Sequence, residues 1–220
     1  MSMSIAMKGL LAGAAGTALA ACASPEPVVY SGIASSTQLV PNKKRDSAKV
    51  PYRYAAAVEW RSYSRIIIEP VAIYGGPDQQ FGDMSDADKV ELANYMRSRF
   101  TERLGARFVR ATDPVPHTLR LKLTLTGAAT NTPVLATLSR FDIAGGLYNG
   151  VQAVRGGEGS FSGAVMYAVE IYDAPTDRLL NAFVTKQFPG ALNIGASLGS
   201  LAAAKTGIDK GADALAEELN

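Results

Sequence analysis

Several short stretches of the sequence combine residue types that could perform chemistry. Residues 195–199 read Gly-Ala-Ser-Leu-Gly, the G-x-S-x-G pattern that presents the nucleophilic serine of hydrolases on a sharp turn. Such a serine needs a histidine base, which follows the nucleophile in the chain of these hydrolases, whereas the single histidine, His117, precedes Ser197. We therefore interpret Ser197 as an N-cap in a glycine-rich loop, and we predict no catalytic residue.

A phosphate-binding loop is a second candidate. Residues 199–206 have the spacing of the G-x-x-x-x-G-K-S/T loop and end in Lys205 and Thr206, but Ala204 replaces the second glycine. That glycine lets backbone amides approach a phosphate, and the loop should follow a parallel strand rather than precede a terminal helix. The sequence therefore predicts no nucleotide binding.

Metal ligands are scarce in this sequence. The chain has one cysteine and one histidine, which excludes an internal disulfide and any zinc site built from several such residues. Asp83, Asp86 and Asp88 lack the glycine and the terminal glutamate of an EF-hand loop, and helix capping explains them more simply. We expect neither a metal nor another cofactor.

Composition and charge narrow the function further. The 220 residues are 47% hydrophobic and 19% charged, which suits one domain of medium size with a real core. The formal net charge is only +2, from 22 basic and 20 acidic residues, so no strong field is available to collect nucleic acid. We expect no nucleic-acid partner.

The N-terminus predicts an export signal and a membrane anchor. After Lys8, residues 9–21 form an apolar run that is too short to span a bilayer and is typical of a secretory signal. The run leads into Leu19-Ala20-Ala21-Cys22, which resembles the lipobox of bacterial lipoprotein precursors. The resemblance implies that residues 1–21 are removed and that lipidated Cys22 holds the protein at a membrane. With Ala23 rather than aspartate after the cysteine, it implies the outer membrane, facing the periplasm.

Hydrophobic periodicity predicts an α+β domain after a tether. Residues 22–58 are rich in proline and serine and lack periodicity, so they are predicted to be an extended tether, and residues 59–220 a single domain. Strands are predicted at residues 65–74, 107–111, 118–126, 160–172 and 179–188, and helices at residues 86–104 and 197–219. Residues 127–159 fit either a short helix or a loop.

Alternating and helical patterns indicate how these elements pack. Leucines at every second position of residues 118–126 predict a mainly antiparallel sheet with one wet face. Ser85 is expected to cap helix 86–104, and Gly105 to end it in a left-handed conformation. The apolar stripe of that helix is expected to comprise Val90, Ala93, Met96, Phe100 and Leu104. Helices packed on one face of an antiparallel sheet make a two-layer α+β domain.

A ladder of small residues runs into the last predicted helix. It comprises Gly195, Gly199, Ala203, Gly207 and Gly211. Glycine costs up to about 1 kcal/mol at each helical site, so such a ladder is normally offset by close packing. We favour packing of this helix, or of the loop before it, on its own sheet. Self-association through the groove, or contact with lipid or a membrane partner, stays open.

Several segments resemble one family. They are the lipobox, Tyr30-Ser31-Gly32-Ile33, the strand YSRIIIEPVAIY and the hairpin AVEIYDAPTDRLLNAFV, spread over most of residues 22–219. Together they are similar to a family of bacterial lipoproteins catalogued only as a domain of unknown function. The resemblance implies no catalytic residue.

These observations predict a lipid-anchored protein of the bacterial cell envelope that acts as a non-enzymatic binding or assembly accessory. Its expected partners are the membrane, through Cys22, and other envelope proteins or a second copy of itself. One alternative is a tethered periplasmic enzyme or a module that binds cell wall or a small ligand. Another is a homo-oligomer built through the ladder of residues 195–211.

Overall fold

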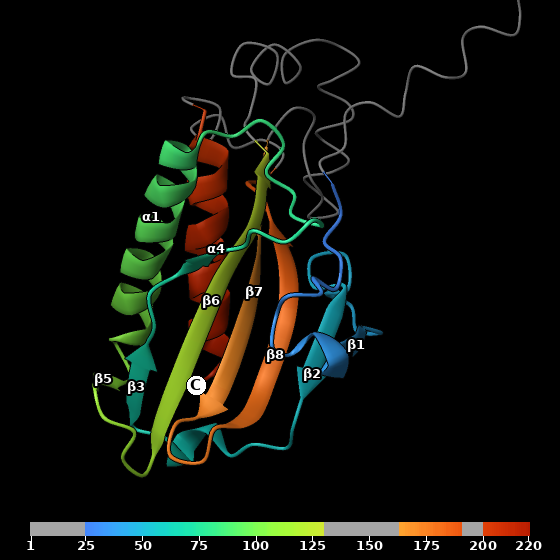
Figure 1. Ribbon diagram of the computed structural model, residues 1–220. Coiled ribbons are helices and arrows are strands. Elements are labelled where there is room, and N and C mark those ends of the chain that lie inside the picture. The colour runs from blue at the N-terminus through green and yellow to red at the C-terminus, as the bar shows by residue number, and fades with distance from the viewer. Residues whose placement is uncertain (1–24, 130–162, 191–199) are drawn as a thin grey trace, which may run out of the picture.

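A single mixed sheet of eight strands forms the centre of the molecule (Figure 1). The computed structural model describes residues 25–129, 163–190 and 200–220. Within these residues, helices α1 (Asp86–Leu104) and α4 (Ala202–Glu218) lie side by side on one face of the sheet. The predicted α+β class and the mainly antiparallel sheet are confirmed.

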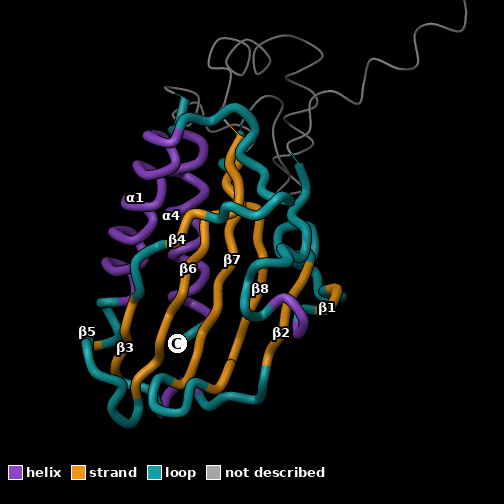
Figure 2. The backbone as a smooth tube through the Cα atoms, viewed as in Figure 1, coloured by secondary structure: helices purple, strands orange, loops and turns teal. Residues whose placement is uncertain are grey.

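The strands follow the path β1-β2-β8-β7-β6-β3-β5, and β4 pairs with the upper part of β6 (Figure 2). Their bounds are β1 Val40–Pro41, β2 Tyr52–Ala55, β3 Arg65–Ile68, β4 Ala72–Ile73, β5 Val109–Arg110, β6 Thr118–Ala129, β7 Ala164–Asp173 and β8 Arg178–Gln187. Strands β3 and β4 pair with β6 in parallel, and β3 pairs with β5 in parallel; the other pairs are antiparallel. Parallel pairing arises here because the chain crosses over through α1 before it returns to the sheet.

Helix α1 begins where its cap was predicted. The Ser85 hydroxyl accepts a hydrogen bond from the Asp88 amide at 3.1 Å. The left-handed end predicted at Gly105 is wrong: its φ is −64°, and its amide continues the helical pattern by donating to the Thr101 carbonyl. Val90 is half exposed, so it does not belong to the buried stripe, and Leu92 takes its place.

The core between the helices and the sheet follows the predicted alternation. Leu119, Leu121, Leu123 and Leu125 of β6 are all at most 1% exposed and pack in one cluster with residues of α1 and α4. Every residue of β7 before Asp173 is buried, so both faces of this central strand are covered.

The N-terminal segment covers the face of the sheet opposite the helices, which we call the outer face. Tyr30, Ile33 and Leu39 are buried there against alternate residues of β7 and β8. The predicted tether of residues 22–58 is therefore wrong for residues 25–58, and the domain begins well before residue 59. The apolar residues of this segment are spaced too irregularly to show a period, but they cover a face of the sheet that would otherwise be exposed to solvent.

A clasp of hydrogen bonds fixes this segment to the loop after β4. The Tyr74 hydroxyl donates to Asp78 Oδ1 at 2.6 Å and accepts from the Gly32 amide at 3.0 Å. The rings of Tyr30 and Tyr74 meet edge to face at 5.4 Å, and the Tyr30 hydroxyl donates to Gln80 at 2.7 Å.

Among the described helices, none combines the length and the apolar character needed to cross a bilayer.

Candidate functional site

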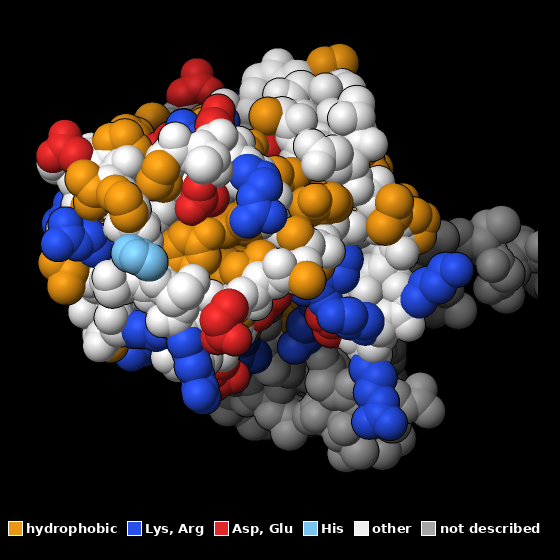
Figure 3. All heavy atoms as spheres, turned by 90° about the horizontal axis from the view of Figure 1, so that it is seen from below, with side chains coloured by type: hydrophobic (Ala, Val, Ile, Leu, Met, Phe, Trp, Pro, Cys, Tyr) orange, Lys and Arg blue, Asp and Glu red, His pale blue; other side chains and the backbone are white. Residues whose placement is uncertain are grey.

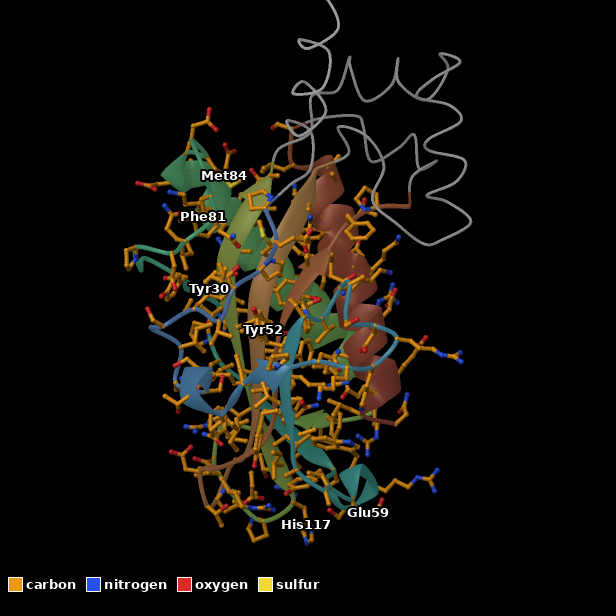
Figure 4. All side chains as sticks on the ribbon, turned by 90° about the vertical axis from the view of Figure 1, so that its right-hand side faces the viewer. Tyr30, Tyr52, Glu59, Phe81, Met84 and His117 are labelled. Carbon is orange, nitrogen blue, oxygen red and sulfur yellow. The ribbon has the colours of Figure 1, made fainter. Side chains whose placement is uncertain are left out.

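A pocket forms where the two helices stop covering the sheet. Helices about 10 Å wide laid over strands about 4.8 Å apart cover only about four strands between them. This sheet is wider, and its β8-β2 edge is covered instead by the segment between β1 and β2, residues 42–51. Between that segment, β8 and α4 lies a pocket of about 360 Å³, which we call the α4 pocket. Figure 4 faces this edge of the sheet, with Tyr52 labelled on β2.

Two hydrogen bonds hold the covering segment against β8. The Lys49 carbonyl oxygen accepts from the Lys186 amide at 2.8 Å and from the Thr185 hydroxyl at 2.9 Å. The backbone of Lys49 is thereby fixed beside the upper end of β8. Its neighbour Val50 joins Phe183 and Leu215 in forming the apolar part of the pocket wall.

The small residues of α4 set the opposite wall. A Cβ at Gly207 would lie 2.8 Å from the Gln187 carbonyl oxygen, and a Cβ at Gly211 would collide with the Tyr167 hydroxyl. Ala203 is completely buried as well. The described part of the ladder is thus a face that packs on the protein's own sheet, as the packing alternative expected, and not an exposed oligomer face.

A buried tyrosine hydroxyl reaches the pocket past Gly211. Tyr167 is 1% exposed, and its ring meets Phe100 edge to face at 6.0 Å. Its hydroxyl forms no hydrogen bond within the residues that the structure describes, and Tyr167 and Gly211 both line the pocket. Burial raises the pKa of Tyr167, so the group is a neutral donor. An acceptor in the pocket would restore a bond whose loss costs about 1–3 kcal/mol.

Two lysines meet at the upper end of the pocket, near Phe188. Lys210 Nζ donates to the Phe188 carbonyl oxygen at 3.3 Å, and Lys49 Nζ lies 5.5 Å from the centre of the Phe188 ring. Burial, and secondly the charge of Lys49, hold the pKa of Lys210 below its ordinary value. Neither ammonium group forms an ion pair with a carboxylate of the described residues. Within the described residues, this end therefore carries positive charge without a carboxylate partner.

The lower end of the pocket is compensated. The Arg53 guanidinium lies 3.3 Å from Glu218 Oε1 and 3.7 Å from Asp46 Oδ2. Glu218 Oε1 also accepts from the Asn181 side-chain amide at 2.8 Å. This network joins the covering segment to the C-terminal turn of α4 and closes the pocket there.

The residues considered from the sequence for catalysis or metal binding lie away from the α4 pocket. His117 lies at the lower end of the molecule, where it is exposed and its Nδ1 is 2.9 Å from the Ser62 carbonyl oxygen (Figures 3 and 4). Asp86 and Asp88 lie in the first turn of α1. Within the described residues, no three His, Cys, Asp or Glu side chains gather to hold a metal ion.

The remaining candidates divide between α4 and the parts of the chain that are not described. Lys205 and Thr206 lie inside α4: the lysine pairs with Glu91 at 2.5 Å, and the threonine hydroxyl donates to the Ala202 carbonyl oxygen at 2.9 Å. Cys22, Gly195, Ser197 and Gly199 lie outside the described residues.

Sequence reasoning missed Tyr167, Lys49 and Lys210 as site residues. Gly211 was the one signal that pointed to the pocket, because a glycine inside a helix indicates a close neighbour. The identity of that neighbour is a long-range fact that spacing does not reveal.

Comparisons with known proteins place the chain in a family. A family model described as "Protein of unknown function (DUF3313)" matches residues 29–215. None of the curated proteins compared with the chain matches it. Two crystal forms of a PelC dodecamer from Paraburkholderia phytofirmans, one of them a point variant, are similar in fold at 14% identity and a TM-score of 0.40. The match covers 74% of this chain and 93% or 94% of theirs, and at this distance it carries no information about function.

Proposed function

We propose that this chain, which belongs to the DUF3313 family, is a lipid-anchored protein of the bacterial cell envelope whose folded domain binds a small ligand in the α4 pocket without transforming it. The observation that carries the proposal is the Tyr167 hydroxyl, which forms no hydrogen bond within the described residues and faces a pocket of about 360 Å³. Pockets of roughly 300–1,000 Å³ with a few polar groups on apolar walls are typical of small-ligand sites.

The groups that face the pocket suit recognition of an acceptor. Tyr167 supplies a neutral hydroxyl donor, and Lys49 and Lys210 supply ammonium donors. All three can donate a hydrogen bond, and the two lysines also carry positive charge, so the pocket suits a ligand that accepts hydrogen bonds or is anionic.

The docked N-terminal segment supports a short link to the membrane. Glu26 Oε1 lies 3.0 Å from Lys186 Nζ, and the Glu26 carbonyl oxygen accepts from Gln80 at 2.8 Å. Cys22 and Glu26 are four positions apart in the chain, with three residues between them, and this stretch spans at most about 14 Å. A lipid on Cys22 would therefore hold the domain against the bilayer, at the end where β6 and β8 finish and α4 begins (Figure 1).

The anchor is tested by fractionation of cells that express the full chain. The protein is expected in the membrane fraction, and Cys22→Ala should release it or leave it unprocessed. An unchanged membrane fraction for the variant would refute the anchor.

Ligand binding is tested by native mass spectrometry of the protein extracted from its own membranes. A small-molecule adduct is expected, and it should be absent from Ala214→Phe, because Ala214 is an exposed residue of α4 that lines the pocket. Glu217→Phe, at an exposed position of the same helix that does not line the pocket, is the matched control and should keep the adduct. If neither the protein nor the control carries an adduct, the proposed binding is wrong.

A further inference from the structure

The two charged ends of the α4 pocket differ in how their charges are compensated. At the lower end, Arg53 is paired with Asp46 and Glu218. At the upper end, Lys49 and Lys210 both reach Phe188, and neither has a carboxylate partner among the described residues. Two like charges brought together without a counter-charge are destabilising, and a bound anion would relieve the repulsion.

The wall between these ends is apolar and of limited length. Lys210 and Glu218 lie eight residues apart on α4, which corresponds to about 12 Å along the helix. Gly211, Ala214 and Leu215 of α4 line the intervening stretch, opposite Val50 and Phe183. This stretch suits the apolar body of a ligand, and the Tyr167 hydroxyl lies beside it as a donor.

We infer that the α4 pocket takes a small anionic amphiphile, with its anionic group between Lys49 and Lys210 and its apolar body along Leu215 and Phe183. This inference rests on the proposed ligand binding at the same pocket and adds the charge, the polarity and the orientation of the ligand. The anionic group belongs at the lysine end because the arginine at the other end already has two carboxylate partners.

Two probes of equal chain length and opposite charge test the inference. Decanoate and decyltrimethylammonium, both below their micelle concentrations, are titrated by calorimetry into the exported full chain carrying Cys22→Ser, which removes the lipid site and no described residue. Decanoate is expected to bind at least tenfold more tightly than the cation. Ala214→Phe should abolish decanoate binding, because it fills the pocket.

Charge variants locate the anionic group. Lys210→Met and Lys49→Met should each weaken decanoate binding about tenfold and leave the cation unaffected or bound more tightly. Lys205→Met is the matched control, because Lys205 lies on the same helix, is paired with Glu91 and does not line the pocket; its decanoate affinity should stay unchanged. The thermal unfolding midpoint of Lys210→Met should change little, since Lys210 is exposed and forms no ion pair with a carboxylate of the described residues.

The possible outcomes separate the inference from the proposed function. If both probes bind equally well and Ala214→Phe blocks both, the pocket binds ligands but the preference for an anion is wrong. If neither probe binds while the adduct found in native mass spectrometry remains, the amphiphile is wrong and the binding function stands. If the adduct is absent too, both fail. A preference for phosphatidylglycerol over phosphatidylcholine vesicles, without binding of monomeric decanoate, would identify a membrane lipid instead and overturn the small ligand.

Discussion

Replacing Gly211 with alanine tests the contact that shapes both α4 and the pocket. A Cβ at this position would overlap the Tyr167 hydroxyl, which sits on a rigid, buried ring. Alanine gains about 1 kcal/mol over glycine inside a helix, whereas overpacking a buried contact costs about 1–3 kcal/mol. Because the obstacle is not the end of a flexible side chain, we expect the steric cost to win and Gly211→Ala to lower the free energy of unfolding by about 1 kcal/mol.

The Tyr167→Phe background isolates this clash. Without the hydroxyl, the nearest atom to the new Cβ is Tyr167 Cζ, at 3.0 Å, which a small shift can accommodate. The cost of overpacking should then fall until it roughly equals the helical gain, so that Gly211→Ala becomes nearly neutral. Tyr167→Phe alone should raise the unfolding free energy of the ligand-free protein by about 1 kcal/mol, because it removes an unpaired buried hydroxyl.

The assay is urea denaturation of the wild type, both single variants and the double variant, analysed as a double-mutant cycle. A coupling of at least about 1 kcal/mol is expected between the two sites. Gly207→Ala is the control, because its Cβ would approach the Gln187 carbonyl oxygen, which Tyr167→Phe does not move. The reasoning is refuted if Gly211→Ala costs the same in both backgrounds, or if it stabilises the wild type.

Three further results are expected. Ser85→Ala should lower the unfolding free energy by about 1 kcal/mol in urea denaturation, and Ser85→Asp should restore most of it. Tyr74→Phe removes the hydrogen bonds to Gly32 and Asp78 and should speed limited proteolysis of the N-terminal segment; unchanged cleavage would show that the clasp is dispensable. Burial raises the pKa of Tyr30 from 10.0 to about 12. The unfolded protein therefore loses this proton near pH 10 while the folded protein keeps it, so the free energy of unfolding should be unaffected below pH 10 and fall by about 1.4 kcal/mol per pH unit between pH 10 and pH 12. Tyr30→Phe should flatten this loss in denaturation midpoints measured across that range.

Local patterns were sufficient to predict the helix-facing layer of the fold. The alternation of leucines in β6 identified its buried face, and Ser85 with Asp88 identified the start of α1. Both are decided by neighbours within a few residues, so a single sequence contains the information. The helical stripe was off by one position, since Val90 is exposed and Leu92 is buried.

The covering of the outer face could not be predicted, because it depends on residues far away in the sequence. Tyr30 and Ile33 are buried by residues more than a hundred positions later in the chain, such as Ala168, and their own spacing has no period. Proline and serine around them indicate an irregular backbone, and an irregular backbone can pack as well as it can extend. Composition alone therefore did not distinguish a tether from a covering segment.

The candidate site depends on still longer-range contacts. Lys49 and Lys210 come from a loop and a helix that approach each other only because the sheet is too wide for two helices. Only Gly211 carried a local signal, and it indicated close packing without identifying the group that required it.

Substitutions at Gly211 and Tyr167 also test whether these residues serve stability or ligand binding. A glycine inside a helix costs about 1 kcal/mol relative to alanine, and a buried hydroxyl without a partner costs about 1–3 kcal/mol. Phenylalanine and alanine at these two positions would therefore give a ligand-free protein at least as stable as the wild type. If the hydroxyl serves the pocket, the double variant Tyr167→Phe with Gly211→Ala should keep its unfolding free energy. It should still bind decanoate more weakly, because the hydroxyl donor is gone and a methyl group takes its place. Unchanged affinity in a stable double variant would mean that the Tyr167 hydroxyl does not contribute to ligand binding, and that the lysines alone hold the ligand.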